Sequence, residues 1–176
     1  MEPLELHYRD CPTVEVELVI SAEPEVVWAL VADIQLPARF SSEFRGAQWL
    51  DGATGPTLGG RFVGRNHHPA AGDWETTSTI VEYEPDRAFG WAVGDPEEPS
   101  SRWRFSLTPH EEGVRLAQWM QMGPARSGIN LAIDAMPDKE SKILHRRLAE
   151  HRTNMEATLQ GIKRLAEEGP PTDGGR

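Results

Sequence analysis

The sequence predicts an α+β fold in which a curved antiparallel sheet of about seven strands is covered by one long C-terminal helix. Residues 13–20 alternate apolar and mostly acidic side chains, as a half-buried strand does. Residues 46–122 contain six further strand-like stretches separated by short turns. Residues 138–168 repeat apolar side chains at steps of three, four or seven, which is the spacing of an amphipathic helix. Such a helix is the obvious cover for the apolar face of the sheet.

The strand over residues 13–20 is followed by a helix predicted over 24–34. Ser21 precedes this helix and Pro24 stands in its first turn, where proline is tolerated. The helix carries apolar residues at helical spacing, namely Val27, Trp28, Val31 and Ile34. Pro37 ends it, and residues 38–40 add a short helical turn.

The remaining strands form an antiparallel meander. They are predicted at residues 46–51, 60–68, 74–84, 87–94, 101–108 and 113–122. The segments between them are short and rich in Gly, Pro and Asp, which favour turns. Because parallel neighbours need a crossover of about a dozen residues, such short segments indicate antiparallel pairing.

The last third of the chain is helical. The apolar stripe of the long helix consists of Leu144, Leu148, Met155, Leu159, Ile162 and Ala166, with His151 filling its gap. Pro137 separates this helix from residues 127–137, which form either a shorter helix or an omega-type segment. We expect a single domain over residues 1–168 and a disordered tail over 169–176.

Composition limits the class of protein. The 176 residues are 38% hydrophobic, enough to bury a core without disulfides or structural metal. The single cysteine, Cys11, cannot form an intramolecular disulfide, and residues 1–10 lack the features of a signal peptide. No stretch reaches the roughly 20 apolar residues that span a bilayer. We therefore expect a soluble cytoplasmic protein, monomeric or homodimeric, without membrane insertion.

The net charge of -10 argues against nucleic-acid binding, which depends on attraction to phosphates. A small basic cluster, Arg146, Arg147 and Arg152, lies on the predicted long helix. Its acidic neighbours Glu140, Glu150 and Glu156 offset it, so these charges are interpreted as a solvated face.

Side chains alternate between the two faces of a strand, and Phe62 marks the inner face of its strand. Pooling the strands and the long helix gives a predicted ligand-binding set with apolar walls and a few polar groups. The set is Phe62, Asn66, His68, Trp74, Thr76, Ser78, Trp91, Trp103, Phe105, Gln118, His151 and Met155.

Each member of this set also has a purely structural interpretation. Asn66 could satisfy buried backbone groups beside a turn. His68 and His151 could be ordinary strand-end and core-edge histidines. Thr76 and Ser78 suit any strand, and the tryptophans suit any core.

The sequence indicates no metal or cofactor. His67 and His68 are adjacent on a strand and point to opposite faces, so they cannot readily chelate one ion. There is no HExxH, CxxC or GxSxG pattern. The glycine-containing residues 55–64 lack the Lys-Ser/Thr of a phosphate-binding loop.

Several stretches carry a family resemblance: "VISAEPEVVWALVADIQLPARF", "GGRFVGRN", "EYEPDRAFGWAV" and the long C-terminal helix. Over about residues 14–166, the chain resembles the START-like or SRPBCC superfamily, especially its polyketide cyclase/dehydrase-like branch. The resemblance implies a helix-grip fold with a deep pocket for a hydrophobic or aromatic small molecule. Members range from ring-closing enzymes to lipid carriers and chaperone-associated modules, so the fold alone does not choose a function.

Three functions follow as hypotheses. The first is binding of a hydrophobic, polyketide-like or lipid-like molecule in a cavity between the sheet and the long helix. The second is polyketide cyclisation or dehydration, with His68 or His151 as general acid or base and Asn66 or Gln118 orienting a carbonyl. The third is a chaperone-associated or other protein-interaction module that uses the outer face of the sheet, with Arg102, Arg104 and Trp119.

Overall fold

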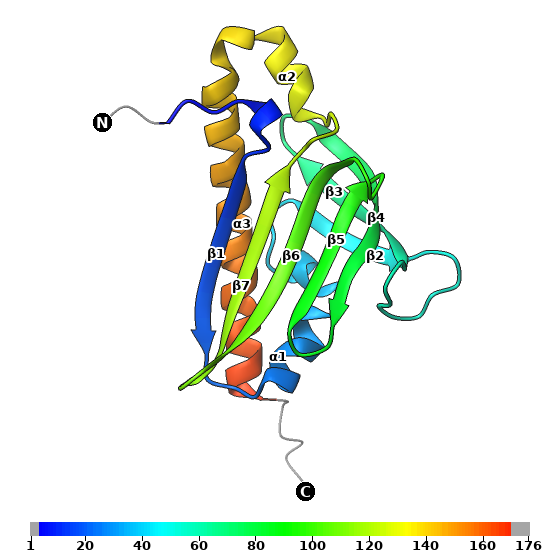
Figure 1. Cartoon of the computed structure of the whole chain (residues 1–176), viewed down its shortest axis with the longest axis vertical. Helices are drawn as coiled ribbons and strands as arrows, with labels where there is room; N and C mark the ends of the chain where they lie inside the picture. The colour runs from blue at the N-terminus through cyan, green and yellow to red at the C-terminus, as the bar shows by residue number, and fades with distance from the viewer. Residues whose placement is uncertain (1–3, 170–176) are drawn as a thin grey trace, which may run out of the picture.

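The computed structural model describes residues 4–169, and seven strands of that range form one antiparallel sheet of order β1-β7-β6-β5-β4-β3-β2 (Figure 1). The strands are β1 Thr13–Ile20, β2 Phe44–Trp49, β3 Arg61–His68, β4 Gly72–Glu84, β5 Ala88–Gly94, β6 Pro99–His110 and β7 Gly113–Met122. The predicted fold class and antiparallel meander are confirmed. Apart from Gly169, the predicted tail lies outside the described residues.

Helices flank the sheet at its start and end. They are α1 Pro24–Val31, α2 Ile129–Ala135 and α3 Glu140–Glu168, with 3-10 turns η1 Tyr8–Asp10, η2 Leu36–Arg39 and η3 Pro137–Lys139. Helix α1 ends three residues before the predicted limit, because Asp33 turns the chain by accepting a hydrogen bond from the Gln35 amide. That turn brings Leu36 into the core. Of the two structures predicted for residues 127–137, a shorter helix or an omega-type segment, the helix is the one observed, as α2.

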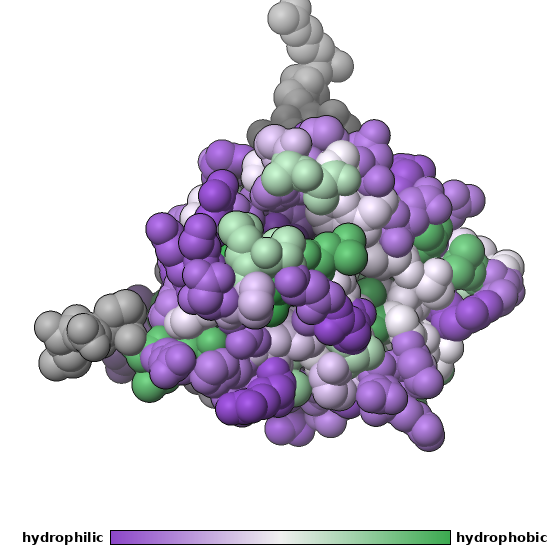
Figure 2. All heavy atoms as spheres, turned by 90° about the horizontal axis from the view of Figure 1, so that it is seen from above, coloured by the Kyte–Doolittle hydropathy of each residue, from purple (hydrophilic) through white to green (hydrophobic). Residues whose placement is uncertain are grey.

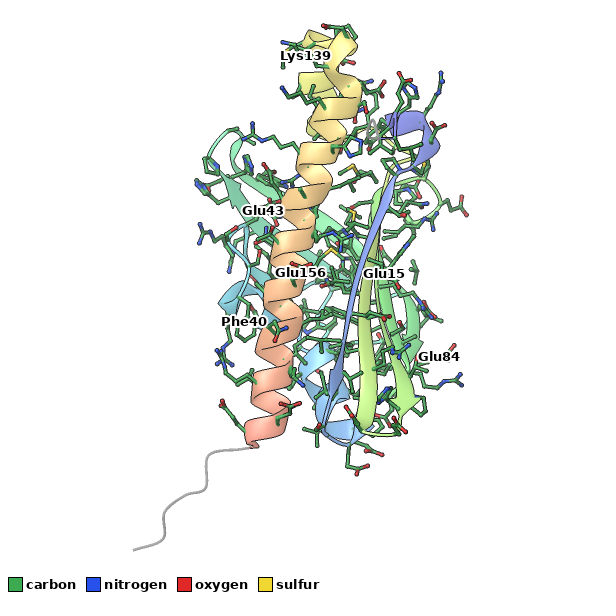
Figure 3. All side chains as sticks on the ribbon, turned by 90° about the vertical axis from the view of Figure 1, so that its left-hand side faces the viewer. Glu15, Phe40, Glu43, Glu84, Lys139 and Glu156 are labelled. Atoms are coloured by element: carbon green, nitrogen blue, oxygen red, sulfur yellow. The ribbon has the colours of Figure 1, made fainter. Side chains whose placement is uncertain are left out.

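Helix α3 lies along the inner face of the sheet beside the edge strand β1 (Figures 1 and 3). Lys163 donates a hydrogen bond from Nζ to the carbonyl oxygen of Val19 at 2.7 Å, and Arg152 donates to that of Glu15 at 3.2 Å. These bonds satisfy carbonyl groups on an edge strand, which would otherwise invite pairing with another chain. No helix within residues 4–169 has the length and apolar character needed to cross a membrane.

The interior at the α1 end is tightly packed and apolar. Its side chains come from β1, α1, β5, β7 and α3, and all are at most 1% exposed: Ile20, Val27, Phe89, Leu116, Leu159 and Ile162. Phe89 meets the ring of Trp28 of α1 edge to face, with centroids 6.3 Å apart. Burial of these apolar side chains stabilises the fold by about 1.5–3 kcal/mol each.

Candidate functional site

An aromatic wall covers the inner face of the sheet beyond the apolar core. Trp91 of β5 stacks on Trp103 of β6 with an interplanar angle of 5° and a centroid distance of 6.2 Å. The rings of Phe62 and Phe105 pack against the same Trp91 ring, with centroids 6.1 and 6.0 Å from its centroid. From α3, His151 meets Trp103 edge to face at 5.3 Å. The fold thus brings these five predicted site residues together on the inner side of the sheet, and α3 reaches the wall through the contact of His151 with Trp103.

Other residues of the predicted set take different places. Ser78, Gln118 and Met155 are deeply buried on the inner side, at 1%, 5% and 2% exposure. The Oε1 atom of Gln118 is buried without a hydrogen-bond partner within the described chain. Asn66 and Trp74 face each other across β3 and β4, near the hairpin that joins these strands, and both are half-buried. Thr76, also half-buried, lies two residues further along β4.

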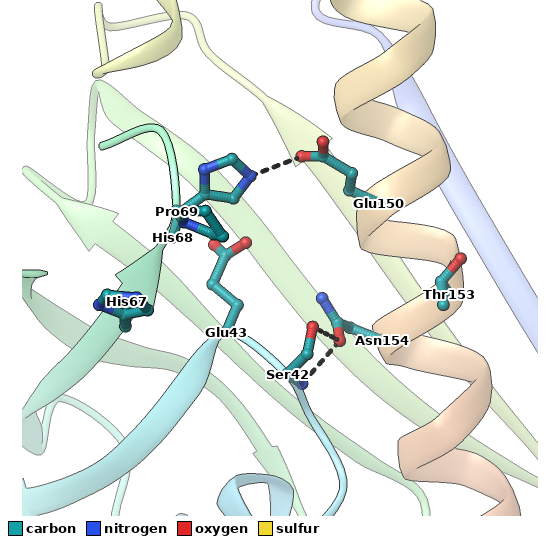
Figure 4. A pocket seen from close by; sticks show the side chains of 8 residues that line it. All are labelled: Ser42, Glu43, His67, His68, Pro69, Glu150, Thr153 and Asn154. Carbon is teal, nitrogen blue, oxygen red and sulfur yellow. Dashed lines mark hydrogen bonds and ion pairs between the residues drawn. The ribbon is translucent and has the colours of Figure 1, made fainter. Parts of the chain in front are cut away.

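A pocket of about 230 Å³ opens where the ends of β2 and β3 face α3 (Figure 4). Three separate segments of the chain line it: Ser42, Glu43, His67, His68, Pro69, Glu150, Thr153 and Asn154. Asn154 ties two of the segments together, since its Oδ1 accepts hydrogen bonds from the amide and the hydroxyl of Ser42, both at 2.9 Å. These two hydrogen bonds hold the segment before β2 against α3 at the pocket wall.

A charged network stands at the edge of this pocket. Arg147 of α3 donates to both carboxylate oxygens of Glu43, at 2.7 and 2.5 Å, and to Glu150 at 3.1 Å. The Arg147 and Glu43 side chains are only 17% and 12% exposed. Glu150 in turn lies 3.3 Å from Nε2 of His68. The network links the residue before β2, the end of β3 and α3 through Arg147 and Glu150.

The ionisation of these groups follows from their surroundings. Burial opposes the ionisation of Glu150, but the hydrogen bond and charge of Arg147 and the charge of His68 hold the pKa of its carboxyl below the usual value. Burial also disfavours the charged form of Arg147, but the hydrogen bonds and charges of Glu43 and Glu150 raise the pKa of its guanidinium group. At neutral pH, Glu150 therefore presents a carboxylate to His68.

His151 behaves differently from His68. Burial first, and then the charges of Arg147 and His68, lower the pKa of His151 to about 3. His151 is therefore neutral at physiological pH and a weak base. Of the two histidines that the sequence offers as proton-transfer groups, His68 is better placed, because it borders the pocket and has a carboxylate partner.

The adjacent histidines do not act as a pair. Nδ1 of His67 lies 2.7 Å from Asp73, across the β3–β4 hairpin, whereas His68 points toward Glu150 (Figure 4). Within residues 4–169, no group of three or more His, Cys, Asp or Glu side chains is arranged to hold a metal ion.

One interpretation from the sequence was wrong. Arg147 and Glu150 do not belong to a solvated face, although Arg146 and Arg152 do, with side chains 81% and 51% exposed. Arg147 follows the buried Leu144 by three positions and precedes His151 by four, so it shares their side of α3. That spacing was the available signal. Sequence reasoning also missed Ser42, Glu43, Thr153 and Asn154.

Comparison with known proteins gives a consistent family match. The model of the family described as polyketide cyclase / dehydrase and lipid transport matches residues 12–167. The solution structure of a Polyketide_cyc-like protein from Corynebacterium glutamicum is 32% identical, with a TM-score of 0.63, over 93% of this chain and 97% of that one. No curated protein matches the chain.

Two more distant structures share the fold. They are the di-domain ARO/CYC proteins BexL, from the BE-7585A biosynthetic pathway, and StfQ, from the steffimycin pathway. Their identities are 18% and 14%, and their TM-scores are 0.66 and 0.65. The matches cover 90% and 89% of this chain and 50% of each of those chains, so the likeness extends over half of each di-domain protein.

Proposed function

The chain belongs to the polyketide cyclase / dehydrase and lipid transport family, and we propose that it binds a hydrophobic or aromatic small molecule between the inner face of the sheet and α3. The observation that carries this proposal is the aromatic wall of Phe62, Trp91, Trp103 and Phe105. A polar pocket opens at the β2 and β3 ends beside α3. Apolar walls with a few polar groups are the usual composition of a small-molecule site.

The two parts of the site would recognise two parts of the ligand. The stacked indoles of Trp91 and Trp103 suit a flat apolar body, because aromatic rings prefer offset or edge-on contacts with other rings. This body would take the place that the His151 ring holds against Trp103. A hydroxyl or carbonyl group on the ligand would then lie toward His68 and Glu150.

We infer that such a ligand enters at the end of the molecule that carries α2. Seen from that end, the surface has apolar residues near its centre and hydrophilic residues around them (Figure 2). Leu131 of α2 and Met136 just after it are 75% and 40% exposed. These two exposed apolar side chains would make the first contacts with an entering ligand.

The first experiment is native mass spectrometry of freshly purified protein, followed by extraction and identification of any bound molecule. We expect a retained apolar compound or, in a library screen, compounds that raise the melting temperature and change tryptophan emission. Trp103→Leu should weaken binding about tenfold, since it removes an aromatic ring from the wall that the ligand would contact. The control is Trp119→Leu, on the outer face. Lack of binding across a broad library, or equal affinities of the two variants, would contradict the proposal.

A second candidate function is supported by the ion pair between His68 and Glu150. In this alternative, the protein is a cyclase or dehydratase, and His68 transfers a proton in the pocket. During dehydration of a β-hydroxyketone, His68 would remove the proton next to the carbonyl and return it to the departing hydroxyl as water leaves. General acid–base catalysis of this kind contributes about 10²–10⁴-fold to a rate.

Paired histidine variants test this activity. With an aromatic β-hydroxyketone as substrate, dehydration is followed by the absorbance of the conjugated product. His68→Gln should lower kcat by about 10²-fold or more while the affinity for the substrate is retained. His110→Gln is the matched control, because His110 lies at the β6–β7 hairpin and does not line the pocket. Equal turnover by wild type and both variants would rule out His68 as the proton-transfer group.

A further inference from the structure

A second hollow lies on the outer face of the sheet, opposite to α3. Its volume is about 310 Å³, and it is lined by Glu15, Arg104, Ser106 and Trp119. Strand register explains the grouping, since Glu15 of β1 faces Trp119 of β7, which faces Arg104 of β6. Residues that face each other across a ladder point to the same side of the sheet. The hollow is therefore separate from the proposed ligand site.

A glycine opens this hollow by letting Arg104 lean away from Trp119. The next residue across the sheet from Arg104 is Gly90, followed by Glu82 of β4. Arg104 reaches over Gly90 and binds Glu82 through two hydrogen bonds of 2.6 and 2.9 Å. A Cβ atom on Gly90 would lie 3.3 Å from Cβ of Glu82 and would crowd this pair. The guanidinium group is thereby held toward β4.

The charges around the hollow favour a cation. The bidentate bond to Glu82 neutralises Arg104, and the same bond, with the charges of Glu84 and Glu15, raises the pKa of Arg104. Glu15 and Glu17 are exposed, and neither forms an ion pair within residues 4–169. An unpaired carboxylate thus stands directly beside the Trp119 indole.

The ring of Trp119 is itself free to bind. Within the described part of the chain, both cation–π contacts involve Phe40, and no aromatic pair includes Trp119. An indole face is the best of the aromatic side chains at attracting a cation, and the attraction is larger when a carboxylate is close. Trp119 is half-buried, so its position is fixed by its neighbours while part of its surface stays accessible.

We propose that this outer hollow receives a lysine or arginine side chain from a partner protein, held between the Trp119 indole and the Glu15 carboxylate. Ser106, which also lines the hollow, offers a hydroxyl as acceptor. A free small cation fits the site less well, because small-molecule sites usually enclose most of their ligand and only four residues line this hollow. A protein partner would supply the remaining contacts on the outer face of the sheet around the hollow.

Two matched peptides test this proposal. One is an acetylated, amidated peptide of alternating alanine and lysine, and the other has norleucine in place of lysine. In a titration followed by NMR of the backbone and indole N–H groups, we expect the lysine peptide to shift the signals of Trp119 and Ser106. The norleucine peptide should leave them in place. Equal shifts from both peptides, or equal affinity for tetramethylammonium, would overturn the proposal.

Variants of the full chain separate the two contacts. Glu15→Gln and Trp119→Leu should each weaken lysine-peptide binding by about threefold, as expected for exposed ionic and cation–π contacts. Glu25→Gln, an exposed carboxylate on α1, is the control and should bind as the wild type does. The NMR spectrum of each variant reports whether the sheet is intact. Unchanged affinity in folded Glu15→Gln and Trp119→Leu would contradict the assignment.

Discussion

The two ends of the space between the sheet and α3 are built by opposite means. At the α1 end, side chains such as Ile20, Phe89 and Leu159 are at most 1% exposed and purely apolar. At the pocket end, the same sheet and helix bury Arg147 against Glu43 and place Glu150 beside His68. The first end is held by close packing and the second by compensated charge, so they should respond differently to substitution.

This difference has a physical origin in what each end can tolerate. A packed apolar region is sensitive to volume, because added or removed atoms disturb contacts on every side. A buried ion pair adds little net stability, yet the loss of one partner leaves an uncompensated charge away from water. The pocket end is therefore the place where one substitution should have the largest effect.

The largest effect is expected from Arg147→Met. This change leaves Glu43 buried without its cation, and we expect it to lower the free energy of unfolding by about 3–5 kcal/mol, as for other broken buried pairs. The control is Arg146→Met, since Arg146 is the neighbouring residue and its side chain is 81% exposed. Urea unfolding followed by circular dichroism measures both. If both variants lose a similar amount of the free energy of unfolding, the buried pair of Arg147 with Glu43 does not stabilise the pocket end.

Sequence patterns predicted the fold well because its elements depend on local periodicity. The alternation of residues 13–20 and the helical stripe from Leu144 to Ala166 are visible without knowledge of the rest of the chain. The faces of the strands followed from the same alternation, with Phe62 and Phe105 buried and Arg61 and Arg104 exposed. The face of each strand that carries apolar residues is the face that the fold buries, so the alternation alone determines which side chains point inward.

The pocket was much harder to predict. It joins residues 42–43, 67–69 and 150–154, and only tertiary packing brings these segments together. Glu43 stands in a short connecting stretch without periodicity, so nothing in its surroundings marks it as the partner of Arg147. His68 alone among the pocket residues belonged to the predicted ligand-binding set. Buried charge pairs between distant segments leave little local signal.

The packed end can be tested with Gly161→Ala. A Cβ atom on Gly161 of α3 would lie 2.5 Å from two atoms of the Phe40 ring. Overpacking should lower the free energy of unfolding by about 1–3 kcal/mol, although alanine favours helix by about 1 kcal/mol. Gly128→Ala is the control, since no atom lies within 4 Å of its added Cβ. If Phe40→Leu fails to restore stability to Gly161→Ala, the clash is not the cause.

The acid sensitivity of the pocket end should depend on His151. Its folded pKa of about 3 lies below the ordinary 6.5, so the unfolded chain binds a proton more readily. The contribution of His151 to the free energy of unfolding is therefore fully present above pH 6.5, and it is lost progressively as the pH falls toward about 3.

His151→Phe keeps a ring against Trp103 and removes this proton. Between pH 8 and 5, the free energy of unfolding of the wild type should fall by about 2 kcal/mol more than that of His151→Phe. The difference follows from linkage, which costs about 1.36 kcal/mol for each pH unit below 6.5. Urea midpoints across this range give the comparison, and His110→Gln on the β6–β7 hairpin is the control. Parallel pH profiles for wild type and His151→Phe would show that His151 is not held neutral by the fold.

The smallest effect should come from Gln118, which lies on the inner face and combines apolar surroundings with a buried polar atom. Because its Oε1 has no partner within the described chain, Gln118→Met should raise the free energy of unfolding by about 1 kcal/mol. Gln121→Met makes the same change on the outer face of β7 and should leave stability within about 0.5 kcal/mol. If the ligand supplies a hydrogen-bond donor to this oxygen, Gln118→Met should gain stability and lose affinity together. A stability loss in Gln118→Met would instead place this residue among the groups that hold the fold.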